Sequence, residues 1–320
     1  MLLKLVPDNT KIPFTKGRFA AVGFSFLLAV ASIAAVATMG LNFGVDFKGG
    51  VTIEVEKEGA VDLGAIRSGL GALDLGEVAV TEIQDVGAGE KGVLVTVAQQ
   101  DPREGEDFDA AQQRAADEVR AELQQILGDD VVFRKQEVVG ATVSGELIEK
   151  GALAVGLAVV LMVLYIWWRY EWQFAVGSIV ALFHDIAITM GVLSVTRLDF
   201  NISTIAALLT IVGYSMNDTV VVFDRVRENL RKYKKMPLAE LIDLTINETL
   251  TRTVMTSGTT LLSLVALFFF GGEVLRGFTG AIIFGILIGT YSSIFVAAPF
   301  LMWTGVKRDW SKVKAATAEA

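Results

Sequence analysis

The 320-residue chain contains no cysteine and only one histidine, His184. The absence of cysteine excludes disulfide bonds and thiol catalysis. A metal site built from several histidines is impossible with one imidazole, and a serine hydrolase would have little to use as a base. We therefore predict neither a metal nor a cofactor.

Motifs for nucleotide and ester chemistry are also missing. The sequence has neither a phosphate-binding P-loop nor a Gly-x-Ser-x-Gly nucleophile motif. An intramembrane aspartyl protease would need two carboxylates in facing spans, which Asp185 and Asp218 could formally provide. We predict that the protein is not an enzyme.

Long apolar runs are the main feature of the sequence. Hydrophobic residues make up 52% of the chain, and the mean hydropathy is +0.52. A helix needs about 20 apolar residues to cross a bilayer. We predict an α-helical polytopic membrane protein with six transmembrane helices, at Phe19–Met39, Gly151–Trp168, Trp172–Val195, Ile202–Val222, Thr253–Phe270 and Gly277–Trp303.

Basic residues gather on one side of the predicted membrane. The two short outer loops contain only Arg197 and Arg276, whereas the segments assigned to the cytoplasm contain most of the others. This asymmetry predicts that both termini are cytoplasmic. Ala35–Ala37 resembles a signal cleavage site, but the apolar run is about 21 residues, too long for a secretory signal, so we expect an uncleaved anchor.

Charge divides the chain into two parts. Residues 41–150 contain 23 acidic and 10 basic residues, whereas the remainder contains 13 acidic and 18 basic residues. We predict an acidic soluble domain at 40–148 on the outer side, and nucleic-acid binding has no support. The other predicted parts are a cytoplasmic N-terminus (1–18), a first span (19–39), a helical bundle (149–303) and a cytoplasmic tail (304–320).

Alternating apolar residues predict four strands in the outer domain, and two further stretches predict helices. Their order, βαββαβ, is that of the split ferredoxin-like motif, an antiparallel sheet with helices on one face. We expect a docking or peptide-contact module. The elements are predicted at Val51–Glu56, Asp62–Leu73, Glu77–Gln84, Gly92–Gln99, Phe108–Leu127 and Asp130–Val139, with a turn at Gly87–Gly89.

A basic segment, residues 224–251, joins the fourth and fifth spans. A solvated loop that follows the positive-inside rule explains most of it, and a contact with anionic lipid or a cytoplasmic partner is the alternative. Leu238–Leu250 is expected to form an amphipathic helix at the membrane interface.

Asp218 lies inside the fourth span, where an ionisable group costs about 2.5–3.5 kcal/mol and usually binds a proton, an ion or a partner helix. Tyr214 and Asn217 share its helical face. Arg252 enters the fifth span from the same side and Thr256 follows it, so the two spans could form a proton path. The alternatives are a structural pair for Asp218 and an arginine that snorkels to the interface.

Two further pairs lie in the third and sixth spans. His184 and Asp185 could form a proton relay or a hydrogen-bonded helix contact, and the sequence favours neither. Gly285 and Gly289 have the spacing of a close-packing motif, which predicts a tight helix contact.

Four ordered stretches resemble the SecF family of the bacterial SecDF translocation accessory: Phe43–Gly50, Phe183–Asp185, Gly213–Asn229 and Thr251–Ser257. Six spans with one outer domain after the first are also similar to that family. The resemblance implies half of an RND-type bundle in the bacterial inner membrane, with the outer domain in the periplasm.

The resemblance also implies partners and roles. A SecF protein would pair with SecD, associate with the SecYEG channel and with YidC and YajC, and use the proton gradient to complete preprotein translocation after the SecA ATPase has acted. Asp218 and Arg252 would be the family's essential aspartate and arginine.

Two other functions are compatible with the sequence. A half-size RND exporter would show substrate-selective efflux and a partner other than SecD. A translocon scaffold without proton transport would tolerate Asp218→Asn but not the loss of its outer domain.

Overall fold

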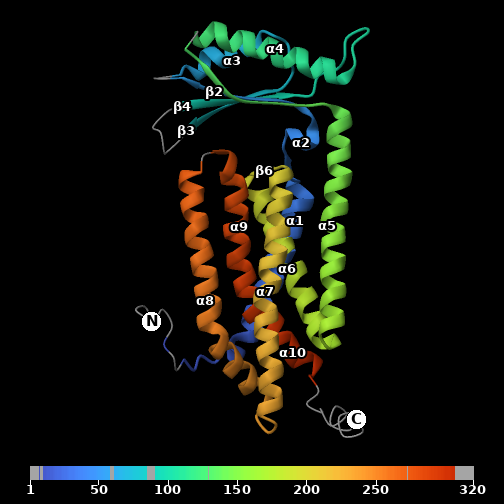
Figure 1. The fold of residues 1–320 in the computed structure, drawn as a ribbon, viewed down its shortest axis with the longest axis vertical. Coiled ribbons are helices and arrows are strands. Elements are labelled where there is room, and N and C mark those ends of the chain that lie inside the picture. Colours follow the sequence, from blue (N-terminus) through green and yellow to red (C-terminus); the bar gives the residue numbers. More distant parts are fainter. Residues whose placement is uncertain are drawn as a thin grey trace, which may run out of the picture.

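The computed structural model describes residues 7, 10–57, 61–84, 91–128, 130–271 and 273–306. Long helices form a bundle, and a small sheet domain lies at one end of it (Figure 1). We call the opposite end of the bundle the distal end. Among the described residues, six helical stretches are long and apolar enough to cross a membrane, as predicted.

Three of these stretches form the centre of the bundle and three cover its sides. At least half of the apolar window is buried in α6, α7 and the last stretch, against about a tenth or less in α1, α5 and α8. The stretches are α1 (Arg18–Met39, preceded by the short η1, Phe14–Gly17), α5 (Ala141–Arg169), α6 (Trp172–Thr196), α7 (Ile202–Lys232), α8 (Leu238–Phe270) and, last, α9 (Glu273–Ser292) with η2 (Ser293–Ala297) and α10 (Ala298–Thr304).

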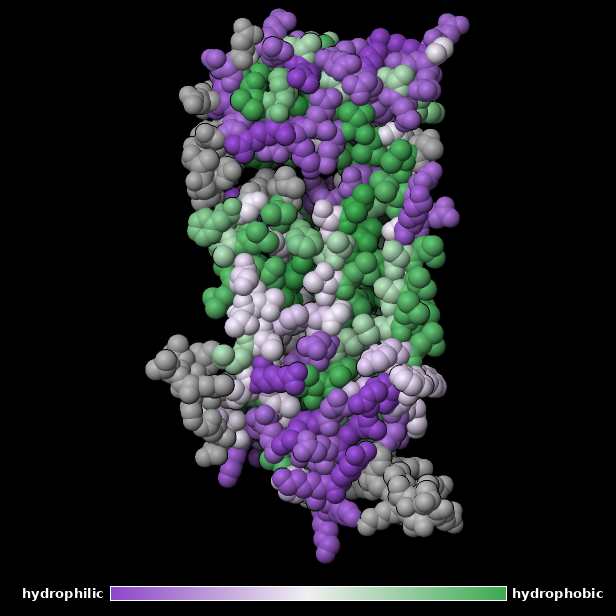
Figure 2. Space-filling model, in the orientation of Figure 1, coloured by the Kyte–Doolittle hydropathy of each residue, from purple (hydrophilic) through white to green (hydrophobic). Residues whose placement is uncertain are grey.

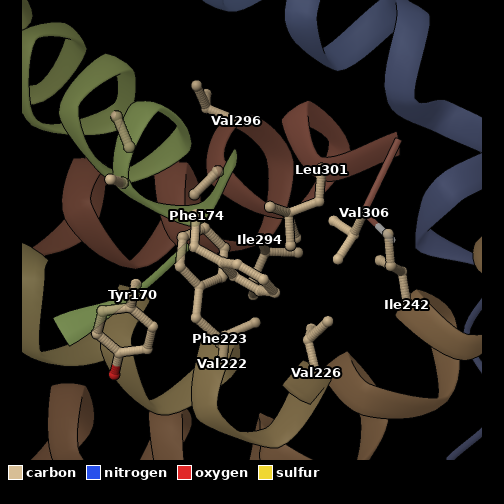
Figure 3. Packing of buried hydrophobic residues seen from close by; sticks show 14 of the residues in the cluster. Tyr170, Phe174, Val222, Phe223, Val226, Ile242, Ile294, Val296, Leu301 and Val306 are labelled. Atoms are coloured by element: carbon tan, nitrogen blue, oxygen red, sulfur yellow. The ribbon is translucent and has the colours of Figure 1, made fainter. Parts of the chain in front are cut away.

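Apolar side chains hold the distal half of the bundle together. Figure 3 shows Phe174 of α6 and Phe223 of α7 in contact, with Ile294 of η2 and Leu301 of α10 beside them. The two phenylalanine rings pack edge to face, with centroids 5.2 Å apart. This packing fixes η2 against α6 and α7.

Helices α7 and α8 are longer than the predicted spans. The 31 residues of α7 reach about 46 Å, more than the roughly 30 Å of a bilayer core. Leu238–Leu250, expected as a separate interfacial helix, instead forms the first part of α8, and only residues 233–237 separate it from α7.

Polar contacts explain this extension beyond the membrane. Arg225 of α7 donates to Glu248 of α8 at 2.7 Å. Asn229 donates to Thr245 at 3.0 Å and to Glu248 at 2.7 Å. The two helices therefore continue side by side through a polar interface. The hydropathy of the sequence does not predict this part of the helices, because its residues are not apolar.

The sheet domain has the predicted order of strands and helices. Its sheet has the order β3-β4-β2-β5 with every neighbouring pair antiparallel. Asp62 and Asp107 cap the two helices, and the predicted turn at Gly87–Gly89 lies outside the described residues. The elements are β2 (Gly50–Lys57), α3 (Leu63–Gly71), β3 (Val78–Gln84), β4 (Lys91–Ala98), α4 (Phe108–Leu127) and β5 (Val132–Val139).

Both helices cover the face of the sheet that points away from the bundle (Figure 1). The core between them includes Val51 and Val95 from the sheet, Ile66 from α3 and Val119 from α4, all fully buried. β2 is an inner strand of the sheet, paired by β4 and β5. It is also the strand that follows the first span along the chain.

The segment between α1 and β2 is attached to the beginning of α7. Within it, β1 (Asn42–Phe43) pairs in parallel with β6 (Asp199–Phe200), which directly precedes α7, and α2 (Val45–Lys48) follows. The N–H of Ile202 donates to the Asp46 carboxylate at 3.0 Å. This junction fixes the entry of the sheet domain to the helix that carries Asp218.

Two glycines make the turn from α2 into β2 possible. Gly49 and Gly50 have φ values of +73° and +130°. A Cβ on Gly50 would lie 2.3 Å from the carbonyl oxygen of Val97 in the neighbouring strand. Only glycine meets both conditions without strain.

Candidate functional site

Asp218 is buried where three helical elements meet. Its side chain is 6% exposed. One carboxylate oxygen accepts a hydrogen bond from Thr253 of α8 at 2.7 Å, and the other accepts from Ser293 of η2 at 2.5 Å. The carboxylate is therefore held by two hydroxyl donors from two other elements.

The last span provides one of these donors through a π-helical turn. Ser292 and Ser293 stand where α9 gives way to η2. Ser292 donates to Asp185 at 2.7 Å, while Ser293 donates to Asp218 at 2.5 Å. Two consecutive residues thus connect two buried carboxylates. π-Helical turns of this kind are frequent at functional sites.

Asp185 is the more enclosed of the two carboxylates, with no exposed surface. It accepts from Ser215 of α7 at 2.5 Å and from Ser292 of α9, and it contacts His184 Nδ1 at 2.8 Å. The His184 ring stacks on Tyr291, and its Nε2 is buried with no hydrogen-bond partner among the described residues. The pair forms a hydrogen-bonded contact between α6, α7 and α9.

A cluster of hydroxyl groups lies about one helical turn from Asp218, on the side of the sheet domain. Tyr214, one turn before Asp218, donates to Ser257 at 3.3 Å, and Ser257 lies 2.8 Å from the hydroxyl of Thr290. Ser293 donates to the carbonyl of Thr290 at 3.0 Å as well as to Asp218. The predicted site residue Tyr214 therefore reaches Asp218 only through intermediates.

The expected meeting of Arg252 with Asp218 is not what the structure shows. Arg252 is exposed, and among the described residues it makes no ion pair with Asp218. The adjacent Thr253 is the direct donor. Consecutive residues of an α-helix point about 100° apart around the helix axis, so the side chains of Arg252 and Thr253 face different directions.

Asn217 and Thr256, also predicted near the site, lie on the outer surface too. The Thr256 hydroxyl donates to carbonyls of its own helix, at 2.9 Å and 3.1 Å. Together with neighbouring exposed positions these residues form a polar stripe along two spans. We define this polar stripe as Thr210, Gly213 and Asn217 of α7 and Arg252, Thr256, Thr259 and Ser263 of α8.

The polar stripe interrupts the hydrophobic band of the bundle. Figure 2 shows pale and purple residues over α7 and α8, between regions of green. Lipid chains cannot satisfy the hydrogen-bonding and charged groups of such a surface, so polar groups inside a membrane usually face other protein or water.

Gly285 and Gly289 lie against α7. A Cβ on Gly285 would be 2.4 Å from Ile211, and one on Gly289 would be 3.0 Å from Ser215. The absence of side chains lets α9 approach α7 closely, and this approach brings Ser215 and Ser292 to the same carboxylate, that of Asp185.

Four contributing residues were missed by sequence reasoning: Ser215, Thr253, Ser292 and Ser293. The Ser292–Ser293 pair inside an apolar run was the available signal. No group of three His, Cys, Asp or Glu side chains that could hold a metal ion occurs within the described part of the chain.

Comparison with known families gives two matches. The family described as "Protein export membrane protein SecD/SecF, C-terminal" matches residues 118–307. The family described as "SecD/SecF GG Motif" matches residues 34–56, which include the junction segment.

Individual relatives agree with these matches. The chain is 46% identical over 315 residues to the protein translocase subunit SecF of Cereibacter sphaeroides, covering 97% of this chain and 94% of that protein. It is 42% identical over 311 residues to SecF of Rickettsia akari, covering 97% of each.

Solved structures are similar as well. The crystal structure of SecDF, a translocon-associated membrane protein from Thermus thermophilus, matches with a TM-score of 0.79 and 36% identity over 95% of this chain. A SecDF structure in a super-membrane-facing form matches with a TM-score of 0.67 and 36% identity over 99% of this chain. The chain spans 40% and 41% of those two longer chains.

Proposed function

This chain belongs to the SecF family of protein translocase subunits, and we propose that it uses proton transfer at Asp218 to help preproteins complete their passage through the Sec channel. A role accessory to Sec translocation follows from the family. Beyond that role, we propose the proton transfer, the partner proteins and the orientation in the membrane.

The arrangement around Asp218 is the observation that carries the proposal. As a carboxylate, it accepts from Thr253 and Ser293. Once protonated, one of its oxygens becomes a donor, so it can no longer accept two hydrogen bonds in the same way. The Ser293 hydroxyl then has to turn or move, and Ser293 belongs to the π-helical turn. Protonation thereby acts on the packing of the last span.

The membrane potential supplies enough free energy for such a change. Each proton that crosses the membrane is worth about 2.3 kcal/mol per 100 mV, which shifts a two-state equilibrium about fifty-fold. Tyr214, Ser257 and Thr290 form a hydroxyl cluster beside this site, and in the described part of the chain it is joined to Asp218 only through the Thr290 carbonyl and Ser293.

The polar stripe supports a partner inside the membrane. We propose that a SecD subunit covers it and that the two chains together form a complete RND-like bundle. Arg252 would then face the seam between the subunits, next to Thr253, which donates to Asp218. In this arrangement the complex associates with SecYEG, YajC and YidC and acts after the SecA ATPase.

We further propose an inner-membrane location with both termini in the cytoplasm and the sheet domain in the periplasm. The uneven distribution of basic residues between the two sides supports this orientation. A periplasmic sheet domain would hold the emerging preprotein while Asp218 gains a proton and releases it again.

The substitution Asp218→Asn tests the proposal. We expect loss of the proton-gradient-dependent part of preprotein translocation in proteoliposomes that contain SecD and the channel, because an amide neither gains nor releases a proton there. Membrane insertion and SecD binding should remain. Asp117→Asn on the exposed face of α4 makes the same chemical change and should leave translocation intact.

Normal translocation by Asp218→Asn would contradict the proton-transfer role. It would favour a scaffold, in which only the sheet domain matters. Gradient-driven efflux of lipids or drugs without SecD would instead favour an exporter.

A further inference from the structure

A pocket of about 540 Å³ opens at the distal end of the bundle, where the end of α5 meets the last turns of α7. It lies away from the Asp218 site and has no part in the proposed proton transfer. Four of its six lining residues are basic: the pocket is lined by Arg169, Asp224, Arg227, Glu228, Arg231 and Lys232.

The two acidic residues of this basic pocket already have cationic partners. Asp224 accepts from the Tyr170 hydroxyl at 3.0 Å and pairs with Arg169 at 3.6 Å. Glu228 pairs at 2.6 Å with Arg225, which does not line the pocket. Neither carboxylate pairs with Arg227 or Lys232 within the described part of the chain.

Arg227 lacks an anionic partner among the described residues, and it is the more enclosed of the two such cations. Among the described residues no carboxylate pairs with it, and its guanidinium stands over the Tyr170 ring, 5.4 Å from the centroid. Its Nε is buried and has no hydrogen-bond acceptor. A buried, unpaired donor on a charged group is costly, and an anion bound by the guanidinium would reduce that cost.

The aromatic ring of Tyr170 holds the Arg227 guanidinium in position. Burial raises the pKa of the Tyr170 hydroxyl, and its hydrogen bond to Asp224 acts in the same direction. The phenol therefore stays neutral, donates to Asp224 and presents its ring face to the guanidinium, an arrangement favourable to a cation.

The pocket lies at the depth of lipid headgroups. The apolar part of α7 ends near Val222, and Arg227 lies five residues further, about 8 Å along the helix. Beside it, at the turn from α5 to α6, Trp167, Trp168 and Trp172 are 61%, 83% and 54% exposed. Exposed tryptophans of this kind mark the boundary between hydrocarbon and headgroups.

We propose that the basic pocket binds the phosphate of an anionic phospholipid headgroup. Arg227 donates to the phosphate oxygens, Lys232 adds a second positive charge at the rim, and the three tryptophans flank the acyl chains. The match is chemical: a guanidinium fork binds phosphate oxygens in pairs, and the tryptophans favour a ligand that continues into the membrane.

The experiment uses the full chain purified in detergent and native mass spectrometry with phosphatidylglycerol, phosphatidylcholine and inorganic phosphate as probes. We expect retention of phosphatidylglycerol in preference to phosphatidylcholine, and no comparable effect of inorganic phosphate. Arg227→Gln with Lys232→Gln should weaken retention about thirty-fold, the change expected for two cationic contacts at a membrane surface.

Matched variants separate the pocket from general charge and from misfolding. Lys235→Gln removes the same charge from an exposed position close by but outside the pocket, and it should bind as the wild type does. Lys232→Gln alone changes only an exposed side chain, so it cannot unfold the bundle, and it should show a part of the loss.

Three results would overturn the proposal. Equal weakening by Lys235→Gln would show that any cation at this end suffices. Equal binding of inorganic phosphate would identify a soluble ligand. Unchanged lipid retention in the double variant would show that this pocket does not hold the lipid.

Discussion

Two hydroxyl groups hold the Asp218 carboxylate, one at each oxygen, and they come from two elements other than α7. Thr253 belongs to α8 and Ser293 to the π-helical turn of the last span. Hydrogen bonds to a charged group contribute about 1.5–3 kcal/mol each. The charge state of one residue is therefore coupled to the positions of two other helices.

Removing the serine donor tests this coupling. We expect Ser293→Ala to slow gradient-dependent translocation at least about ten-fold, because a loss of about 1.5 kcal/mol at Asp218 corresponds to that factor. Ser293→Thr keeps the hydroxyl and should retain most activity. The measurement is the translocation rate in proteoliposomes with and without a proton gradient.

A suitable control lies at the end of α6, away from the polar stripe. Thr196→Val removes a hydroxyl that donates only to the carbonyl of Val192 in its own helix, and it should leave the rate nearly unchanged. Equal rates for Ser293→Ala and the wild type would show that the serine has no part in proton transfer.

At this scale the sequence identifies the acid but not its partners. The cost of a buried carboxylate makes Asp218 conspicuous in an apolar run. Whether Arg252 or Thr253 points at it depends on the rotation of α8 about its own axis, which hydropathy does not fix. Ser293 could not be placed either, because the π-helical turn changes the face that each following residue presents.

Among the elements, α7 and α9 have the closest contact in the bundle centre. At Gly285 a side chain would overlap Ile211, and at Gly289 it would press on Ser215. Ser215 and Ser292, which both donate to Asp185, bridge the same pair of helices. Close packing and the buried hydrogen bonds therefore depend on each other.

Substitution of the packing glycine separates this contact from general helix propensity. Gly285→Ala should destabilise the chain by about 1–3 kcal/mol, because the added methyl would lie 2.4 Å from Ile211. Gly277→Ala, in the same helix, meets nothing within 4 Å and should be neutral or slightly stabilising. Thermal unfolding of both variants in the same detergent measures the difference, and equal midpoints would contradict the close contact.

Element types were more predictable than element ends. In the sheet domain α4 has the predicted bounds, and β2 and β3 differ from theirs by one residue at most ends. The bundle helices run further than their apolar segments because polar pairs such as Arg225 with Glu248 continue the contact between α7 and α8 outside the membrane. Hydropathy indicates which residues can face lipid, so it does not predict where a helix ends once it has left the membrane.

The molecule as a whole is a bundle and a sheet domain that are joined along the chain by α1 and α5 and attached in addition at the start of α7. The Asp46 carboxylate accepts from the N–H of Ile202 in the first turn of α7, and β1 pairs with β6 directly before it. Asp218 lies sixteen residues further along the same helix, about 24 Å. A displacement of α7 as a rigid body would therefore reach the sheet domain without any contact between the domain and Asp218.

The local contact at Asp46 is the part of this connection that a single substitution can remove. Asp46→Ala leaves the first N–H of α7 without its acceptor and loosens the junction, so the sheet domain should sample a wider range of orientations relative to the bundle. Because the chain has no cysteine, spin labels can be attached at Ala121→Cys on α4 and Leu262→Cys on α8, both exposed positions. Pulsed electron spin resonance then gives the distribution of distances between them.

We expect this distribution to be broader in Asp46→Ala than in the otherwise wild-type pair. Asp101→Ala removes a carboxylate from an exposed site in the sheet domain that does not belong to the junction, and it should leave the width unchanged. If Asp46→Ala also leaves it unchanged, the β1–β6 pairing and the continuation of β5 into α5 hold the domain without this hydrogen bond. If it broadens the distribution while proton flux through Asp218 persists but translocation falls, the junction transmits motion from the proton site to the domain, because only the connection between the two has been altered.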